Sequence, residues 1–80
     1  MLNRFKIEWE CRRGMRELDE MIMPFYQQHF DQLNAQEQQS FITLLTYSDP
    51  ELFRWLMRQE KAPTPELQQI VQTILQKVLA

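Results

Sequence analysis

The sequence has 80 residues, of which 44% are hydrophobic, and its 9 basic and 11 acidic side chains give a formal net charge of -2. A chain of this length buries only about 60% of the surface that its unfolded form exposes, which leaves little material for an enclosed catalytic cleft. We therefore expect one small domain over residues 1–80 and no free-standing enzyme. Net acidity also argues against nucleic-acid binding, because that binding depends on Lys and Arg neutralising phosphates.

Compartment and membrane signals are few. The single cysteine, Cys11, excludes an intramolecular disulfide and is compatible with a reducing environment. No stretch approaches the roughly 20 apolar residues that a membrane helix needs, and no apolar run of signal-peptide length begins the chain. These features predict a cytoplasmic protein that does not enter a membrane.

A first helix is predicted from about Asn3 to Arg12. One glycine and four prolines in 80 residues, without strand-like alternation, favour helices throughout the chain. Leu2, Phe5 and Trp9 stand at helical spacing, so we expect them to form the apolar face of this first helix.

A second helix is predicted after Gly14, and it carries the longest apolar stripe of the chain. Pro24 lacks a backbone donor inside this pattern, so we expect it to kink the helix or to end its regular part. The stripe consists of Met15, Leu18, Ile22, Phe25, Tyr26 and His29.

A third helix is predicted to begin at Asn34. This residue and Glu37 have the spacing of a capping box, in which each side chain satisfies a free backbone donor of the first turn. The expected buried residues are Phe41, Ile42, Leu44 and Leu45.

Two further helices are predicted from proline positions. Asp49 precedes Pro50 and Thr64 precedes Pro65, and each pair is typical of a capping residue followed by a proline in the first turn. The expected buried residues are Leu52, Phe53, Leu56 and Met57 in the fourth helix, and Leu67, Ile70, Val71, Ile74, Leu75 and Val78 in the fifth. The sequence therefore predicts an all-α, compact five-helix bundle. Because no heptad seam persists, we expect a monomer.

Charge is distributed unevenly along this predicted bundle. Residues 1–16 hold five basic and two acidic side chains, whereas residues 17–80 hold four basic and nine acidic ones. The sign of the charge changes within residues 12–20, which contain the single glycine of the chain, Gly14.

This segment supports two interpretations, and the first is a simple helix corner. Gly14 would adopt a left-handed backbone just past the first helix, where Arg12 and Arg13 favour the negative helix end. The acidic residues that follow would favour the positive start of the second helix; they are Glu17, Asp19 and Glu20.

The second interpretation is a contact with another protein. Gly14 has no side chain, so the backbone of a partner can approach it closely. Arg13 and Glu17 would flank the contact and offer bidentate donors and an acceptor. If the second helix extended back over both residues, they could pair with each other, although this order of charges contributes only about a few tenths of a kcal/mol.

The segment Arg13-Gly14-Met15-Arg16-Glu17 resembles the RGxxE signature of the SdhE family, whose members promote covalent FAD attachment to the flavoprotein subunit of succinate dehydrogenase. The resemblance continues in order along nearly the whole domain. It includes Trp9, Cys11-Arg12, Leu18-Asp19, Met23-Pro24-Phe25, Phe41, Leu44-Leu45 and the run from Asp49 to Leu56.

The resemblance implies a non-enzymatic factor that binds flavoprotein subunits of succinate dehydrogenase and, in many bacteria, of fumarate reductase. The flavin bond would form on the partner, where a partner histidine attacks the flavin, so FAD would belong to the partner and not to this chain. Arg13, Gly14 and Glu17 match the motif and are predicted to bind the partner. Arg12, Met15, Arg16 and Asp19 are predicted as surrounding contact surface.

Other reactive residues point to structural roles. His29 has no second His or nearby Cys, which disfavours a metal site. Cys11 would need an adjacent base to act as a nucleophile, so we expect a structural thiol. Trp9 and Trp55 can belong either to the core or to a contact surface, and the sequence does not decide between them; the core is the default for aromatics at helical spacing.

Two other functions are weighed against the assembly factor. An antitoxin-like or nucleic-acid-binding regulator would use the third and fourth helices as a helix-turn-helix, but residues 36–57 hold one Arg and three acids. A free-standing flavin carrier would need a glycine-rich phosphate loop, which this sequence lacks.

Overall fold

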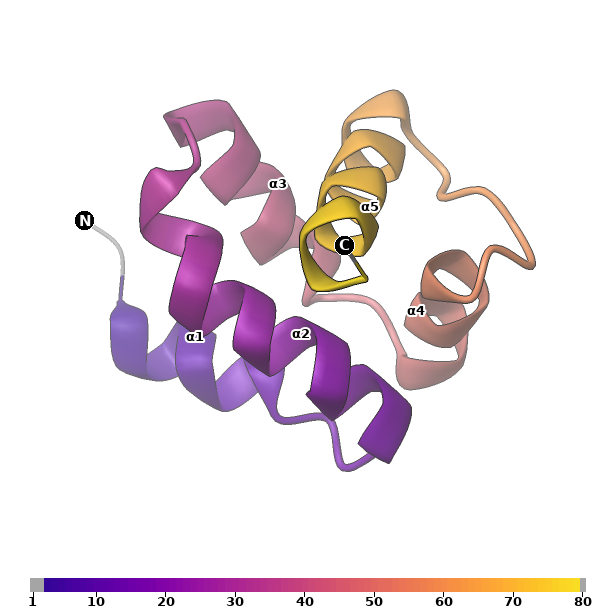
Figure 1. The fold of residues 1–80 in the computed structure, drawn as a ribbon, viewed down its shortest axis with the longest axis horizontal. Helices are drawn as coiled ribbons and strands as arrows, with labels where there is room; N and C mark the ends of the chain where they lie inside the picture. Colours follow the sequence, from indigo (N-terminus) through magenta and orange to yellow (C-terminus); the bar gives the residue numbers. More distant parts are fainter. Residues whose placement is uncertain (1–2, 80) are drawn as a thin grey trace.

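The computed structural model describes residues 3–79, which form five α-helices and one short 3-10 turn (Figure 1). In chain order these elements are α1 (Arg4–Cys11), α2 (Arg16–His29), η1 (Phe30–Gln32), α3 (Ala35–Leu44), α4 (Asp49–Leu56) and α5 (Pro65–Val78). No strand occurs within the described residues. The prediction of an all-α five-helix bundle is therefore confirmed.

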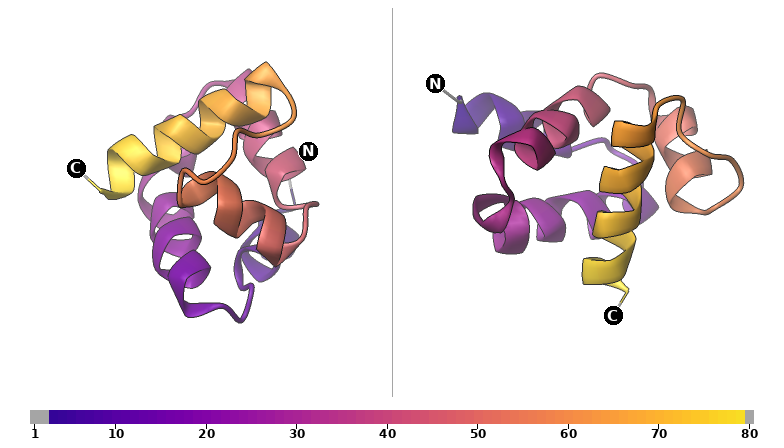
Figure 2. Two further views of the ribbon diagram at one scale, coloured as in Figure 1. Left: turned by 90° about the vertical axis from the view of Figure 1, so that its right-hand side faces the viewer. Right: turned by 90° about the horizontal axis from the view of Figure 1, so that it is seen from above.

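Helix α2 is the central element of the bundle. It packs against α1, α4 and α5, while α5 also packs against α3 and α4. Helix α1 runs antiparallel to α2 along one side of the molecule, and α5 crosses α2 steeply (Figures 1 and 2). This arrangement places the α1–α2 corner and the α3–α4 connection on the same side of the bundle.

The core lies between α2, α3 and α5 and is rich in aromatic rings. Phe25, Tyr26, Phe30 and Phe41 pack on one another with ring centroids 5.1 to 6.3 Å apart. The predicted aliphatic face of α5 surrounds them, with Leu67, Ile70, Val71, Ile74 and Leu75 buried. In the second helix, the predicted Leu18, Ile22, Phe25 and Tyr26 are likewise buried.

Most of the helix starts that were predicted from capping residues and prolines are confirmed. The capping box of Asn34 with Glu37 is present, and the Thr64 hydroxyl accepts from the backbone N–H of Leu67. The cap predicted at Asp49 was wrong, because Ser48 occupies that position and forms a capping box with Glu51. Asp49 is consequently the first helical residue, and its side chain is free to bind elsewhere.

The predicted face of the first helix was also wrong. Phe5 and Trp9 are 91% and 73% exposed, whereas Ile7 and Cys11 are buried against the core. Leu2 lies outside the described residues. Helix α1 packs against α2 through the side that carries Ile7 and Cys11, so these two residues form its whole buried face.

Two smaller differences concern α2 and α4. Pro24 does not end α2, which continues to His29. Trp55 in α4 is buried in the core, whereas Phe53 and the C-cap residue Met57 are only partly buried and pack against the edge of the core. The indole of Trp55 makes an edge contact with the ring of Tyr47, at 5.0 Å between centroids.

Candidate functional site

The corner between α1 and α2 is built around a left-handed glycine. Gly14 has φ +81°, which confirms the predicted backbone conformation. A Cβ placed on Gly14 would meet no atom within 4 Å, so the space beside it is open. The glycine is therefore required by the backbone of this chain and not by packing within it.

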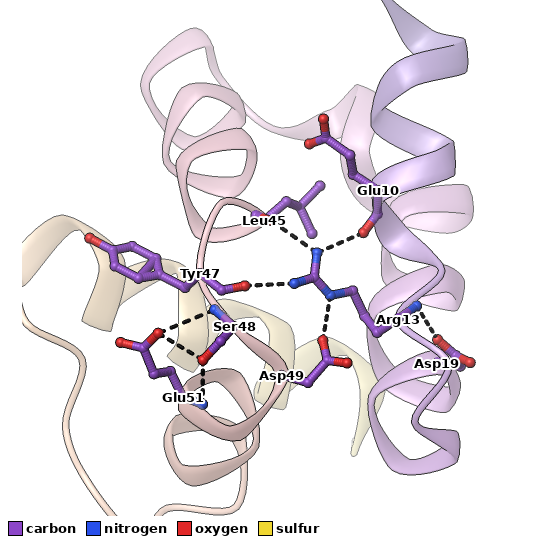
Figure 3. Close-up of polar contacts among 8 residues, drawn as sticks. All are labelled: Glu10, Arg13, Asp19, Leu45, Tyr47, Ser48, Asp49 and Glu51. Atoms are coloured by element: carbon purple, nitrogen blue, oxygen red, sulfur yellow. Dashed lines mark hydrogen bonds and ion pairs between the residues drawn. The ribbon is translucent and has the colours of Figure 1, made fainter.

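Arg13 holds this corner to the α3–α4 connection (Figure 3). Its Nη1 donates to the carbonyl oxygens of Glu10 and Leu45 at 3.0 and 2.9 Å. Its Nη2 donates to the carbonyl of Tyr47 at 2.6 Å, and its Nε donates to Oδ1 of Asp49 at 2.8 Å. Four of the five N–H donors of the guanidinium are thus used inside the protein.

These bonds satisfy carbonyls that the helices leave without partners. Glu10 belongs to the last turn of α1, and Leu45 is the residue that caps the end of α3. The last carbonyls of a helix have no N–H donor within the helix, and the helix dipole favours a cation at this C-terminal end. The interpretation of the segment as a helix corner is confirmed for Arg13.

The start of α2 is attached to the same residue through the backbone. The N–H of Arg13 donates to Oδ1 of Asp19 at 2.8 Å. Asp19 and Glu17 both lie in the first turn of α2, where a carboxylate is favoured by the positive helix end. Asp19 is thereby a part of the corner itself and not a freely exposed acid.

The predicted site residues divide into two groups. Arg13 is only 14% exposed at its side chain, and Met15 packs against the core. Four of the predicted residues at this corner are exposed: Arg12, Gly14, Arg16 and Glu17. The structure thus brings the predicted residues to one corner, but it buries the guanidinium at its centre.

Glu17 and Arg16 differ in how they are held. Arg16 pairs with Glu20 one turn later, at 3.0 Å between Nε and Oε1. Within residues 3–79 no side-chain hydrogen bond or ion pair engages Glu17. The conditional pairing of Arg13 with Glu17 does not form, because α2 begins at Arg16 and Arg13 binds Asp49 instead.

Sequence reasoning missed the partners of Arg13. Asp49 precedes a proline and so has the sequence pattern of a helix cap, and the carbonyls of Leu45 and Tyr47 carry no sequence signal. The sequence contains one hint of the contact with Asp49. Ser48 and Asp49 are both good capping residues, and only one of them can occupy the N-cap position of α4, so the other side chain is available for a different contact.

Cys11 and His29 have local structural environments. Cys11 is fully buried, and burial raises the pKa of its thiol to about 12, so the reactive thiolate does not form near neutral pH. The Nδ1 atom of His29 is buried without a hydrogen-bond partner, and its ring lies 5.7 Å from that of Phe25. The described part of the chain contains no group of His, Cys, Asp or Glu side chains suited to a metal ion. Among the helices of residues 3–79, none has the length and apolar character needed to cross a bilayer.

The sequence and the fold of this chain are both similar to those of known proteins. Residues 5–78 match the family described as "Flavinator of succinate dehydrogenase". The chain is 64% identical over 73 residues to the FAD assembly factor SdhE of Haemophilus ducreyi. This alignment covers 91% of this chain and 89% of that protein. It is 53% identical to the factor of the same name from Pasteurella multocida, over 96% of this chain and 90% of the relative. The solution structure of a UPF0350 protein matches with a TM-score of 0.79 and 40% identity, over 99% of this chain and 87% of that one.

Proposed function

This chain belongs to the family of flavinators of succinate dehydrogenase, and from that membership we propose that it is a non-enzymatic assembly factor that binds the flavoprotein subunit. In this proposal the chain promotes covalent FAD attachment, and the flavin bond forms on the partner. The chain acts as a monomer in the cytoplasm. The flavoprotein subunit of fumarate reductase, which the resemblance to the family implies, is proposed as a second client.

One observation carries the assignment of the binding surface. The corner is fixed from inside by Arg13, while Gly14 and the unpaired Glu17 are exposed on its outer side. An exposed acceptor on a fixed backbone corner, beside an open backbone position, suits a partner that presents donors, because the backbone of the corner loses little conformational freedom on binding. We propose that Gly14 and Glu17 contact the partner directly.

The other predicted site residues have distinct roles in this proposal. Arg12 and Arg16 form the exposed rim of the contact, and Met15 supports it from below. Arg13 and Asp19 position the corner, since their polar groups are bound within the chain.

The proposed mechanism is positioning without a catalytic group. Holding two reacting groups in the correct geometry lowers a barrier by removing the entropy cost of bringing them together. The chain has one glycine and therefore no glycine-rich phosphate loop, so FAD is bound by the partner in this proposal.

The function is tested by depleting the protein from cells and reading covalent flavin. We expect the denatured flavoprotein subunit of succinate dehydrogenase to lose its flavin fluorescence in a gel when the gene is removed, and to regain it with the wild-type chain. The flavoprotein subunit of fumarate reductase is read in the same gel. Unchanged covalent flavin in the depleted cells would contradict the proposal.

A further inference from the structure

The outer face of α1 exposes two aromatic side chains. Phe5 and Trp9 lie four residues apart, which places them next to each other on one side of a helix. They are 91% and 73% exposed, whereas Phe25, Phe30 and Phe41 are fully buried. Of the nine aromatic residues in the chain, no others are exposed.

The other apolar side chains of α1 and its first basic residue already have partners within the chain. Ile7 and Cys11 face the core. Arg4 binds Asp31 and places its guanidinium over the ring of Phe30, at 5.5 Å from the centroid. Phe5 and Trp9 are therefore the apolar side chains of this helix that no other part of residues 3–79 covers.

This face runs into the corner described above. Arg12 follows Trp9 by three residues and is bonded to it through its backbone N–H at 3.1 Å. The exposed residues Phe5 and Trp9 of α1 and Arg12 at its C-cap thus follow one another toward the corner, and this line ends two residues before Gly14. We call this line the α1 outer face.

We propose that the α1 outer face is a second contact surface for the flavoprotein subunit, and that it fits an apolar pocket on that subunit bordered by carboxylates. This inference rests on the function proposed above and extends its contact area beyond the Gly14 corner. Trp9 inserts its indole into the pocket, and Phe5 closes one side of it. Arg12 meets the acidic border.

The area of this face argues for a larger partner and against a second copy of the chain. An aromatic side chain buries at most about 150 to 250 Å², so the pair supplies roughly half of the 800 Å² per partner that a standard interface needs. Pairing of two α1 outer faces alone would be too small. Joined with the exposed residues of the corner, the same face approaches the standard size.

The charges around the pair indicate the chemistry of the border. Lys6 and Arg12 are exposed on α1 and at its C-cap, beside the aromatic pair. Arg4, Arg13 and Arg16 are paired with Asp31, Asp49 and Glu20, so Lys6 and Arg12 are the basic side chains of residues 3–16 that have no ion pair. An acidic border around the partner's pocket is complementary to Lys6 and Arg12.

The test measures the Kd between the purified chain and the purified apo flavoprotein subunit by calorimetry. Trp9→Ala should weaken binding by about thirtyfold and Phe5→Ala by about tenfold, since truncated aromatic anchors are the costliest changes in interfaces. Trp9→Phe should stay within about fivefold of wild type. Leu79→Ala is the matched control, because Leu79 is a 62% exposed apolar residue away from α1, and its Kd should be unchanged. All four variants should melt at the wild-type temperature.

A direct readout uses the two tryptophans as probe and reference. In a chain labelled with 5-fluorotryptophan, the ¹⁹F signal of exposed Trp9 should lose its H2O/D2O solvent shift on binding, while that of buried Trp55 has little to lose. Wild-type binding together with an unchanged Kd for the Phe5→Ala/Trp9→Ala pair would overturn this inference and leave the proposed function intact. A homodimer that this double variant dissociates would overturn it as well. Absence of wild-type binding would contradict both proposals.

Discussion

The guanidinium of Arg13 and the carboxylate of Asp49 lie 2.8 Å apart, although 36 residues separate them in the chain. This ion pair joins the α1–α2 corner to the first residue of α4. Neither side chain is fully exposed, so water screens the pair less than it screens the ion pairs on the outer surface. The contact makes the exposed corner a rigid part of the bundle.

Replacement of Arg13 should destabilise the fold. Arg13→Ala removes four hydrogen bonds and leaves Asp49 and the carbonyls of Leu45 and Tyr47 without their donor, which we expect to cost about 2 to 3 kcal/mol in urea unfolding. Arg16→Ala is the control in the same corner. Its ion pair with Glu20 is exposed, so we expect a change of no more than about 0.5 kcal/mol. Equal stability of the two variants would show that the Arg13 bonds do not hold the corner.

Replacement of Glu17 should separate function from stability. Glu17→Ala should change unfolding free energy by no more than about 0.5 kcal/mol, because the side chain is exposed and unpaired. It should weaken partner binding by about 2 kcal/mol, because a donor on the partner loses its acceptor. Glu66 is a matched control, being an exposed acid in the first turn of α5. Normal covalent flavin with Glu17→Ala would rule out a contact at this residue.

Substitutions at Gly14 should distinguish backbone strain from surface access. Gly14→Ala should cost about 1 kcal/mol because of the positive φ. Gly14→Asn should cost less, since Asn tolerates this conformation better. We expect Gly14→Asn to reduce covalent flavin nevertheless, because its side chain fills the open space where the partner is proposed to lie. If flavin follows stability across both variants, the glycine serves the backbone alone.

A second left-handed residue offers a stabilising change away from the corner. Arg58 has φ +62° just past α4, and the N–H of Gln59 bonds to the carbonyl of Arg54 at 2.8 Å, as in a helix-ending motif that favours glycine. Arg58→Gly should raise the unfolding free energy by about 0.5 to 1 kcal/mol, seen as a higher melting temperature. Covalent flavin should be unaffected. A lower melting temperature would mean that the Arg58 side chain makes a larger contribution than the backbone strain removes.

The raised pKa of Cys11 should make stability depend on alkaline pH. The unfolded thiol ionises near 9.0 and the folded thiol near 12, so the folded chain keeps its proton over the interval in which the unfolded chain loses it. The stability that Cys11 contributes is fully present below pH 9 and is lost as pH rises toward 12. Thermal melts of wild type and Cys11→Ala between pH 8 and 11 should show a smaller decline for the variant. Parallel declines would assign the pH dependence to other groups.

Local sequence patterns are sufficient to predict the helices and most of the core. Helix starts depend on local chemistry, such as Asn34 with Glu37 and Thr64 with Pro65, so neighbouring residues suffice to locate them. The long apolar stripes of α2 and α5 have enough residues at one period to define a buried side. The left-handed Gly14 was predictable for the same reason, since the requirement is local to the turn.

Long-range packing selects which side of α1 is buried and which groups Arg13 binds. In a helix of eight residues, Phe5 and Trp9 or Ile7 and Cys11 define an apolar side equally well, and the choice depends on where α2 and α3 lie. The partners of Arg13 are two carbonyls and a carboxylate from the α3–α4 region, and carbonyls are present in every residue. A long-range contact to the backbone has no sequence pattern, because its specificity comes from the position of the chain and not from the identity of the residues.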